Sequence, residues 1–241
     1  MIENKTVTSW SSGIDEELKY WESFLSSEGR ISEWNERYFA DLFSHDRPVQ
    51  QFVRDLIDRP IGSTLHFLDV GAGPATALGT VWPGYVVNVT AVDPLADFYG
   101  KIMEKTGKYP QIRTRRCPAE SIVTMFGADR FDLVFAQNSL DHSFNPFYAI
   151  FSAVEVCKPG GVVFLNNFPN EAEREYYSGF HQWNFCNDDG QFTIWNKQYR
   201  YNMSQLLSGV CDVKTVDGGS GVLNGFGLNV VMRKLKRDVD L

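Results

Sequence analysis

The stretch Phe67-Leu68-Asp69-Val70-Gly71-Ala72-Gly73-Pro74-Ala75-Thr76 decides the fold. An apolar strand runs here into a Gly-x-Gly turn, and Pro74 suits the first turn of a helix that we expect over residues 74–81. Because glycine has no Cβ, the main chain can bend tightly at Gly71 and Gly73, and a ligand can lie against it. Ligands of open α/β sheets bind outside the carboxyl ends of the strands, so this turn predicts a ligand site.

Strands and helices alternate from residue 65 onward. The patterns predict strands at 65–70, 85–92, 111–116, 131–136, 161–166, 211–216 and 226–232, and helices at 74–81, 95–105, 145–157 and 203–207. Alternation of this kind favours parallel βαβ units with right-handed crossovers. We therefore predict an α/β fold with a doubly wound, mostly parallel sheet of seven strands. Asp132 is expected to be solvated at the start of its strand, and Lys158-Pro159-Gly160-Gly161 to be only a turn.

The chain divides at about residue 60. In residues 1–60, apolar residues recur at helical spacing in three groups, within 18–25, 34–42 and 49–57, which predicts an N-terminal helical cap. Residues 61–241 form the second unit, with an insertion at about 168–201 that is polar and aromatic. A long insertion at the carboxyl end of a strand is usually functional. Its rings Tyr176, Tyr177, Trp183 and Trp195 could stack on a substrate or could pin the insertion onto the domain.

Composition excludes several classes of partner. The formal net charge is −7 and no long basic tract occurs, so the chain lacks the positive face that gripping a nucleic-acid backbone requires. The four cysteines form no C-x-x-C pair, which favours free thiols in a reducing compartment. No apolar run approaches membrane-spanning length. We expect a cytoplasmic protein without nucleic-acid or membrane partners, and the oligomeric state stays open.

Four further segments follow the glycine turn in order. They are Ala91-Val92-Asp93-Pro94 at the end of the second strand, Cys117-Pro118-Ala119-Glu120-Ser121 after the third, Phe131-Asp132-Leu133-Val134-Phe135-Ala136-Gln137-Asn138 at the fourth, and Lys158-Pro159-Gly160-Gly161 before the fifth. With the glycine turn they resemble the class I methyltransferases that use S-adenosylmethionine (SAM), most closely the small type 11 group. The resemblance covers residues 65–164 and implies a Rossmann-like sheet.

The resemblance also implies a set of residues around SAM. They are Asp69, Gly71, Ala72, Gly73, Asp93, Pro94, Ala119, Glu120, Gln137 and Asn138. Asp69 stands where the family has an acid near the methionine amino group, and Asp93 where an acid accepts both ribose hydroxyls, although Asp93 could simply cap the next helix. Many relatives have an acid where Pro118 stands, so that contact with adenine is either absent or made by Glu120.

Candidates for the chemistry lie after the fourth strand. The segment Asn138–Ser143 faces the donor methyl group in the resembled fold, and Asp141 and His142 are acid–base candidates because histidine titrates near neutrality. His142 could instead only cap or pack its loop. His181, in the insertion, is the second candidate base. Asp141, His142 and His181 could also assemble a metal site with Asp188 and Asp189, but no spacing requires a metal, and we expect none.

These patterns favour one function over two alternatives. We expect methyl transfer from SAM to a small molecule or glycan precursor at a hydroxyl, because the insertion is polar and aromatic and no nucleic-acid face is present. An NAD(P)-dependent oxidoreductase could use the same sheet, but Thr76 replaces the third glycine of the dinucleotide fingerprint. A non-catalytic SAM-binding protein is the other alternative.

Overall fold

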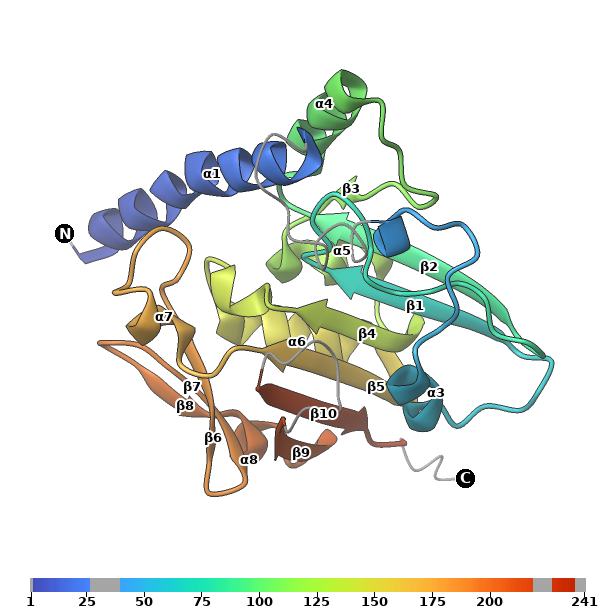
Figure 1. Ribbon diagram of the computed structural model, residues 1–241. Coiled ribbons are helices and arrows are strands. Elements are labelled where there is room, and N and C mark those ends of the chain that lie inside the picture. The colour runs from blue at the N-terminus through green and yellow to red at the C-terminus, as the bar shows by residue number, and fades with distance from the viewer. Residues whose placement is uncertain (1, 27–39, 219–226, 237–241) are drawn as a thin grey trace.

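A central sheet of seven strands organises the molecule, and the computed structural model describes it through residues 2–26, 40–218 and 227–236 (Figure 1). The strand order is β3-β2-β1-β4-β5-β10-β9. The strands are β1 (Thr64–Val70), β2 (Val86–Asp93), β3 (Arg115–Arg116), β4 (Phe131–Gln137), β5 (Cys157–Asn167), β9 (Cys211–Asp217) and β10 (Leu228–Lys234). Strand β10 pairs antiparallel with both of its neighbours, while the pairs among β1 to β5 are parallel. The predicted doubly wound, mostly parallel sheet is confirmed.

Side chains on both faces of the sheet are buried, because neighbouring residues of a strand point to opposite sides. In β4, Leu133 and Phe135 join one apolar cluster while Val134 and Ala136 join the other. The second of these clusters also holds much of α6 (Pro146–Val156), with α5 (Ile122–Phe126) and α8 (Met203–Leu207) beside it. Among the described residues, α3 (Gln51–Leu56) and irregular chain cover the other face. The central strands are therefore packed on both faces.

The predicted helix over residues 74–81 is wrong. All eight residues are described, and none is helical. Their main chain pairs elsewhere: Thr80 and Val81 both donate to the carbonyl oxygen of Arg47, and the side-chain amide of Gln50 donates to the carbonyl of Ala77. A Cβ on Gly79 would overlap the main chain of Pro48. Pairing with a distant segment satisfies the polar groups that a helix would have paired locally.

The other helices lie close to their predicted positions. Helix α4 (Ala96–Thr106) ends at Gly107 in the left-handed conformation, and α6 begins with Pro146 after Asn145, whose side chain accepts from the Tyr148 N–H. The third strand is shorter than predicted, since only Arg115–Arg116 pair with β2. Short 3-10 turns, η1 (Ala119–Ser121) and η2 (Leu140–His142), follow β3 and β4.

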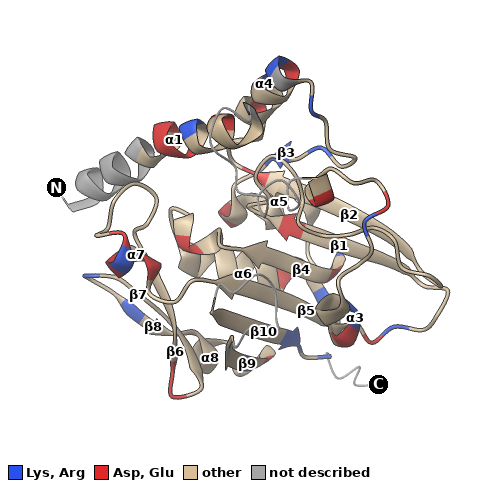
Figure 2. Ribbon diagram, viewed as in Figure 1, with Lys and Arg blue, Asp and Glu red and all other residues tan. Residues whose placement is uncertain are grey.

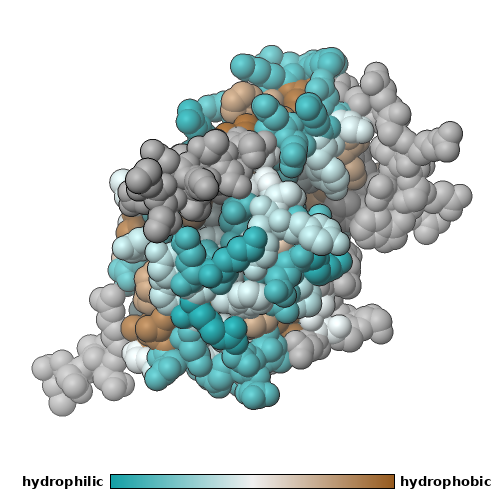
Figure 3. Space-filling view, turned by 90° about the vertical axis from the view of Figure 1, so that its left-hand side faces the viewer, coloured by the Kyte–Doolittle hydropathy of each residue, from teal (hydrophilic) through white to brown (hydrophobic). Residues whose placement is uncertain are grey.

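The insertion folds as a small second sheet rather than as a loose lid. It contains α7 (Glu171–Arg174) and the antiparallel strands β6 (Asn184–Asp188), β7 (Gln191–Trp195) and β8 (Arg200–Asn202). Phe185, Phe192 and Ile194 are buried against the main sheet's cluster. The face of the molecule on the side of α7 is mostly hydrophilic, with apolar patches near its edges (Figure 3).

The N-terminal region supplies one long helix, α1 (Ile2–Ser26), whose side chains are described from Gly13 to Leu25. It runs across the carboxyl ends of the strands, between α4 and the α7 region (Figure 1). Ile14, Leu18 and Trp21 pack with Leu95 and Tyr99 of the α4 region. The second predicted group of the cap lies mostly in residues 27–39, outside the described residues. None of the helices that the structure describes has the length and apolarity of a membrane span.

Candidate donor and acceptor site

The glycine turn has the bend that its sequence predicts. Gly71 and Gly73 have φ angles of 69° and 60°, in the left-handed region that favours glycine. The N–H groups of Gly71 and Ala72 donate to the carbonyl of Val92, at 2.8 and 3.0 Å, which fixes the turn against the end of β2. A Cβ on Gly71 would overlap the side chain of Ser139. Ser139, in the loop after β4, therefore fills the direction in which a side chain at Gly71 would point, and the contact of Gly71 with a ligand stays a prediction.

Asp69 is buried beneath this turn. Its Oδ2 accepts from the Thr76 hydroxyl at 2.6 Å and from the Ala77 N–H at 3.0 Å. Burial raises the pKa of Asp69 to about 6. The carboxylate thus holds the irregular segment that replaces the predicted helix, and its predicted contact with a methionine amino group stays a prediction.

Asp93, at the end of β2, faces the same turn. Its Oδ2 accepts from the Gly73 N–H at 3.1 Å and its Oδ1 from the Leu95 N–H at 2.8 Å. The second bond closes a local turn just before α4 and is not a helix cap, because Leu95 is the N-cap and no side chain caps this helix. Burial raises the pKa of Asp93 to about 6, with a smaller contribution from the carboxylate of Glu17. The Tyr99 side chain also hydrogen-bonds to Asp93 and lowers its pKa, so the carboxylate already has three donors.

Helix α1 lies over the glycine turn, which its residue Trp21 contacts. The indole Nε1 of Trp21 donates to Oε1 of Glu17 at 2.7 Å, and a Cβ on Gly73 would lie 2.9 Å from the Trp21 ring. Glu17 also raises the pKa of Asp93 and of Tyr99, so its carboxylate is near both. Figure 2 shows acidic and basic residues on both α1 and α7. Trp34 and Tyr38, in the second predicted group of the helical cap, lie outside the described residues.

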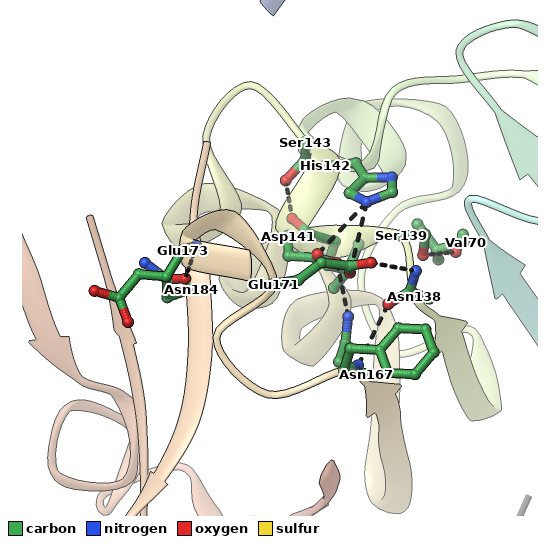
Figure 4. A network of polar contacts seen from close by, with 12 residues as sticks. Val70, Asn138, Ser139, Asp141, His142, Ser143, Asn167, Glu171, Glu173 and Asn184 are labelled. Atoms are coloured by element: carbon green, nitrogen blue, oxygen red, sulfur yellow. Dashed lines mark hydrogen bonds and ion pairs between the residues drawn. The ribbon is translucent and has the colours of Figure 1, made fainter. Parts of the chain in front are cut away.

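A cluster of four titratable side chains lies after β4. Asp141, His142, Glu171 and His181 each offer one ligand-type atom, and these atoms all lie within 4.8 Å of one another. Nε2 of His142 is 3.6 Å from Oδ2 of Asp141 and 3.8 Å from Oε2 of Glu171. Figure 4 shows Asp141, His142 and Glu171 turned toward one another from η2 and α7. We call these four residues the acceptor cluster.

Amide side chains hold the two carboxylates of the acceptor cluster. Asn167, at the end of β5, donates from Nδ2 to Oδ1 of Asp141 at 2.7 Å. Asn138 donates from Nδ2 to Oε1 of Glu171 at 3.4 Å, and its Oδ1 accepts from the Phe168 N–H. The imidazole of His142 meets that of His181 edge to face, with ring centroids 4.5 Å apart. The cluster is therefore positioned by the rigid ends of β4 and β5.

The charges of the acceptor cluster depend on one another. Burial raises the pKa of Asp141 to about 7, while the positive charge of His142 opposes this rise. Burial alone would lower the pKa of His142, but the carboxylates of Asp141 and Glu171 raise it to about 9. Burial and His142 together lower the pKa of His181. An imidazolium at His142 beside ionised Glu171 is thus favoured at neutral pH, and His181 is the more neutral imidazole.

Two of the predicted site residues have structural partners. Oε1 of Glu120 accepts from the Asn145 N–H at 2.9 Å, which ties η1 to the start of α6. Asn138 has a positive φ of 45° and uses its side chain on β5 and Glu171, as described above. Ala119 is buried in the core cluster beside them. Gln137 closes the β4–β5 pairing, and Pro94 follows Asp93 directly.

Most of the rings of the insertion pack inward or against their own loop. Trp183 is buried, Trp195 donates to Oδ1 of Asn170 at 3.2 Å, and the Tyr177 hydroxyl accepts from Asn184. Tyr176 is 89% exposed. The packing alternative therefore holds for three of these four rings. Asp188 and Asp189 lie exposed at the β6–β7 hairpin and do not join the acceptor cluster.

Glu171 is the member of the cluster that sequence reasoning missed. It stands four residues beyond β5, whose end is adjacent to the end of β4 in the sheet. An acid at the carboxyl end of a neighbouring strand was a usable signal. It was hidden because the segment after β5 was treated as the start of a polar and aromatic insertion.

Comparisons with known proteins agree with this geometry. Residues 68–165 match the family model described as a methyltransferase domain. No curated protein matches the chain. A chain of the complex between the Haloferax volcanii Trm112 methyltransferase activator and a methyltransferase is 12% identical, with 87% of this chain and 96% of the other covered and a TM-score of 0.55.

Other similar structures include a carbon and a nitrogen methyltransferase. The CurJ carbon methyltransferase is 16% identical at a TM-score of 0.48, over 74% of this chain and 50% of the other, so this chain spans about half of its length. The N-methyltransferase NodS from Bradyrhizobium japonicum, in complex with S-adenosyl-L-homocysteine, is 12% identical at a TM-score of 0.45, over 95% and 99%. Residues 68–165 thus match a methyltransferase domain, and they lie in the parallel part of the seven-stranded sheet.

Proposed function

We propose that this protein transfers a methyl group from SAM to a hydroxyl of a small molecule or glycan precursor. One observation carries the proposal: the acceptor cluster adjoins the glycine turn. Ser139 packs against Gly71 and donates to the Val70 carbonyl at 2.9 Å, and Asp141 and His142 follow it by two and three residues. A donor on the turn and an acceptor at the cluster would therefore meet at the ends of β1 and β4.

The donor end suits a cationic nucleoside. Bound SAM supplies an electrophilic methyl group on a positively charged sulphur. Asp93 would accept the ribose hydroxyls, and the acids Asp69 and Glu17 place negative charge around a ligand that carries a sulfonium and an ammonium group. Trp21 lies where it must shift to admit the donor, because its ring is against Gly73.

The acceptor end suits a hydroxyl, which must lose its proton as the methyl group arrives. His181 has a lowered pKa and is the neutral imidazole of the pair, so it can accept a proton at neutral pH. His142, held between Asp141 and Glu171, would orient the acceptor and balance charge. Helix α1 and the α7 region would exclude water from the transfer.

The oxidoreductase alternative has less support. Dinucleotide sites place the pyrophosphate at the N-terminus of the helix after the glycine turn. Residues 74–81 form no helix, and the hydroxyl of Thr76 is bonded to Asp69. No pyrophosphate cradle of that kind is therefore present in this described segment.

A thermal-shift experiment tests donor choice. Ligands that bind the native state raise the melting temperature by mass action. We expect shifts with SAM and with S-adenosylhomocysteine, none with NAD, and loss of both shifts in Asp93→Ala. A shift with NAD alone would reverse the assignment.

A second measurement separates an enzyme from a non-catalytic binder. The protein is incubated with isotopically labelled SAM and a panel of sugars, phenols and amines, and the products are read by mass spectrometry. We expect the label on a hydroxylated acceptor. Donor binding without transfer to any member of a broad panel would favour the non-catalytic protein, and label only on amines would exclude the hydroxyl.

A further inference from the structure

The acceptor cluster has an unusual balance of hydrogen-bond donors and acceptors. Oδ2 of Asp141, Oε2 of Glu171 and Nδ1 of His181 are all buried and have no hydrogen-bond partner in the structure. Asp141 itself is only 1% exposed. Burying polar atoms without partners is costly, and burying carboxylate oxygens that face one another is more so. These atoms therefore require something positive between them.

The ligand-type atoms of the four side chains lie close together, and hydrogen bonds to the two carboxylates hold them there. Each carboxylate has one oxygen held by an amide N–H, from Asn167 on Asp141 and from Asn138 on Glu171, and turns its other oxygen toward His142. Partners that fix the outer oxygen of a carboxylate and leave the inner one free are a regular feature of metal sites. Asn167 and Asn138 thus fix the two carboxylates in the way that residues hydrogen-bonded to metal ligands do in metal sites.

The spacing of the atoms is close to that of cation ligands. Tetrahedral ligands at about 2.0–2.2 Å from zinc lie about 3.3 Å from each other. Nε2 of His142 is 3.6 and 3.8 Å from the two carboxylate oxygens, and no pair among the four atoms exceeds 4.8 Å. Side-chain shifts of a few tenths of an ångström to about one ångström would bring all four into coordination.

We propose that Asp141, His142, Glu171 and His181 bind one divalent transition-metal cation of the zinc type. Two imidazole nitrogens and two carboxylate oxygens suit zinc or a similar transition-metal ion, whereas magnesium, calcium and manganese prefer oxygen ligands. The sequence led us to expect no metal, because Glu171 was not recognised and Asp188 and Asp189 were considered in its place.

This inference rests on the proposed function and changes one role in it. A cation here would hold the oxygen of the acceptor beside the donor and lower the pKa of its hydroxyl, so that the proton would leave to water instead of to His181. The alternative is that protons alone bridge the cluster, with His142 as imidazolium between two carboxylates. The two states exclude each other at any moment, because a nitrogen lone pair that binds a cation cannot accept a proton.

The test measures binding of Zn²⁺ itself, without donor or acceptor. Tag-free protein is treated with a chelator, dialysed and titrated with ZnCl₂ by calorimetry, and the Co²⁺-loaded protein is examined by visible absorption. We expect one Zn²⁺ per chain, and d–d bands of a low-symmetry nitrogen and oxygen site with Co²⁺. Glu171→Gln should weaken binding by about tenfold or more, while Glu173→Gln, an exposed acid on the same short helix, should leave it unchanged.

Other outcomes are equally decisive. Wild-type protein that binds no Zn²⁺, or Zn²⁺ binding that Glu171→Gln and His181→Ala leave intact, would overturn the cation site. The donor is measured separately by the thermal shift with SAM in the chelator-treated protein. A SAM shift without Zn²⁺ binding leaves the proposed function standing, and Zn²⁺ binding without a SAM shift leaves only the metal site.

Discussion

At the scale of the residue, His142 is the centre of the acceptor cluster. We expect His142→Ala to lower kcat by about a hundredfold, because an acceptor that His142 no longer orients loses its alignment with the donor methyl group. The dissociation constant of SAM should change little, because His142 lies in the loop after β4 and not in the glycine turn. Steady-state kinetics and calorimetry with SAM measure the two effects. Tyr148→Phe, an exposed change on α6, is the control, and an unchanged kcat in His142→Ala would remove this residue from the mechanism.

Asp93 gives donor binding a pH dependence. Burial raises its pKa to about 6, so lowering the pH from 8 to 5 converts the carboxylate to the carboxylic acid. Only the ionised form accepts from both ribose hydroxyls, so the affinity for SAM should fall as the pH drops below about 6. Calorimetry at several pH values checks this. Asp93→Asn should bind more weakly throughout and show a flatter profile, and a flat wild-type profile would contradict the assignment.

Single residues also show how far the sequence could lead. The positions of Gly71, Gly73, Asp93, Asp141 and His142 could be predicted because each lies at the end of a recognisable strand. Asp132 could not. It is buried and binds Arg59, Lys158 and the His66 N–H, rather than being solvated as we expected. Those partners come from three distant segments, and local sequence does not contain that information.

At the scale of the element, α1 packs closely against the loop before His181. The close contacts are at Gly13 on the helix and at Gly179 on the loop. A Cβ on Gly13 would lie 2.6 Å from the main-chain nitrogen of Phe180, and a Cβ on Gly179 would lie 2.8 Å from Oε2 of Glu16. Phe180 and Gly179 precede His181 directly. Helix α1 and the loop that carries His181 are therefore in direct contact.

Two glycine-to-alanine changes test this contact. Gly13→Ala should push α1 away from Phe180 and cost about 1–3 kcal/mol, which lowers Tm by several degrees. Gly100→Ala, on α4, meets no atom within 4 Å and should stabilise its helix by about 1 kcal/mol. Scanning calorimetry measures both. If Gly13→Ala melted at the wild-type temperature, the close packing of α1 on Phe180 would be wrong.

Elements also mark where prediction from sequence stops. Strands β1, β2, β4 and β5 could be located because they are continuous apolar runs. The helix at 74–81 failed because its main chain bonds to residues 47–50, and no local pattern shows such pairing. The second sheet, β6 to β8, was not predicted. Its many polar residues hide the few apolar ones, Phe185, Phe192 and Ile194, that are buried.

At the scale of the whole molecule, net charge limits the partners. With a net charge of −7, the chain should repel a polyanion, most strongly at low salt where the charges are least screened. We expect no binding of mixed RNA or duplex DNA in a filter assay, even at low salt where electrostatic attraction is strongest. Salt-sensitive retention of RNA would point to a nucleic-acid acceptor and would contradict the small-molecule proposal.

The position of Trp21 has an optical consequence. Its indole lies against Gly73 and donates to Glu17, so a donor that enters must displace a fluorophore from a largely apolar niche. Intrinsic emission should then move to longer wavelength as SAM arrives, and Trp21→Phe should abolish that change although five other tryptophans remain. Stopped-flow mixing would follow entry of the donor in real time without any added dye. A red shift that persisted in Trp21→Phe would show that another indole senses the donor.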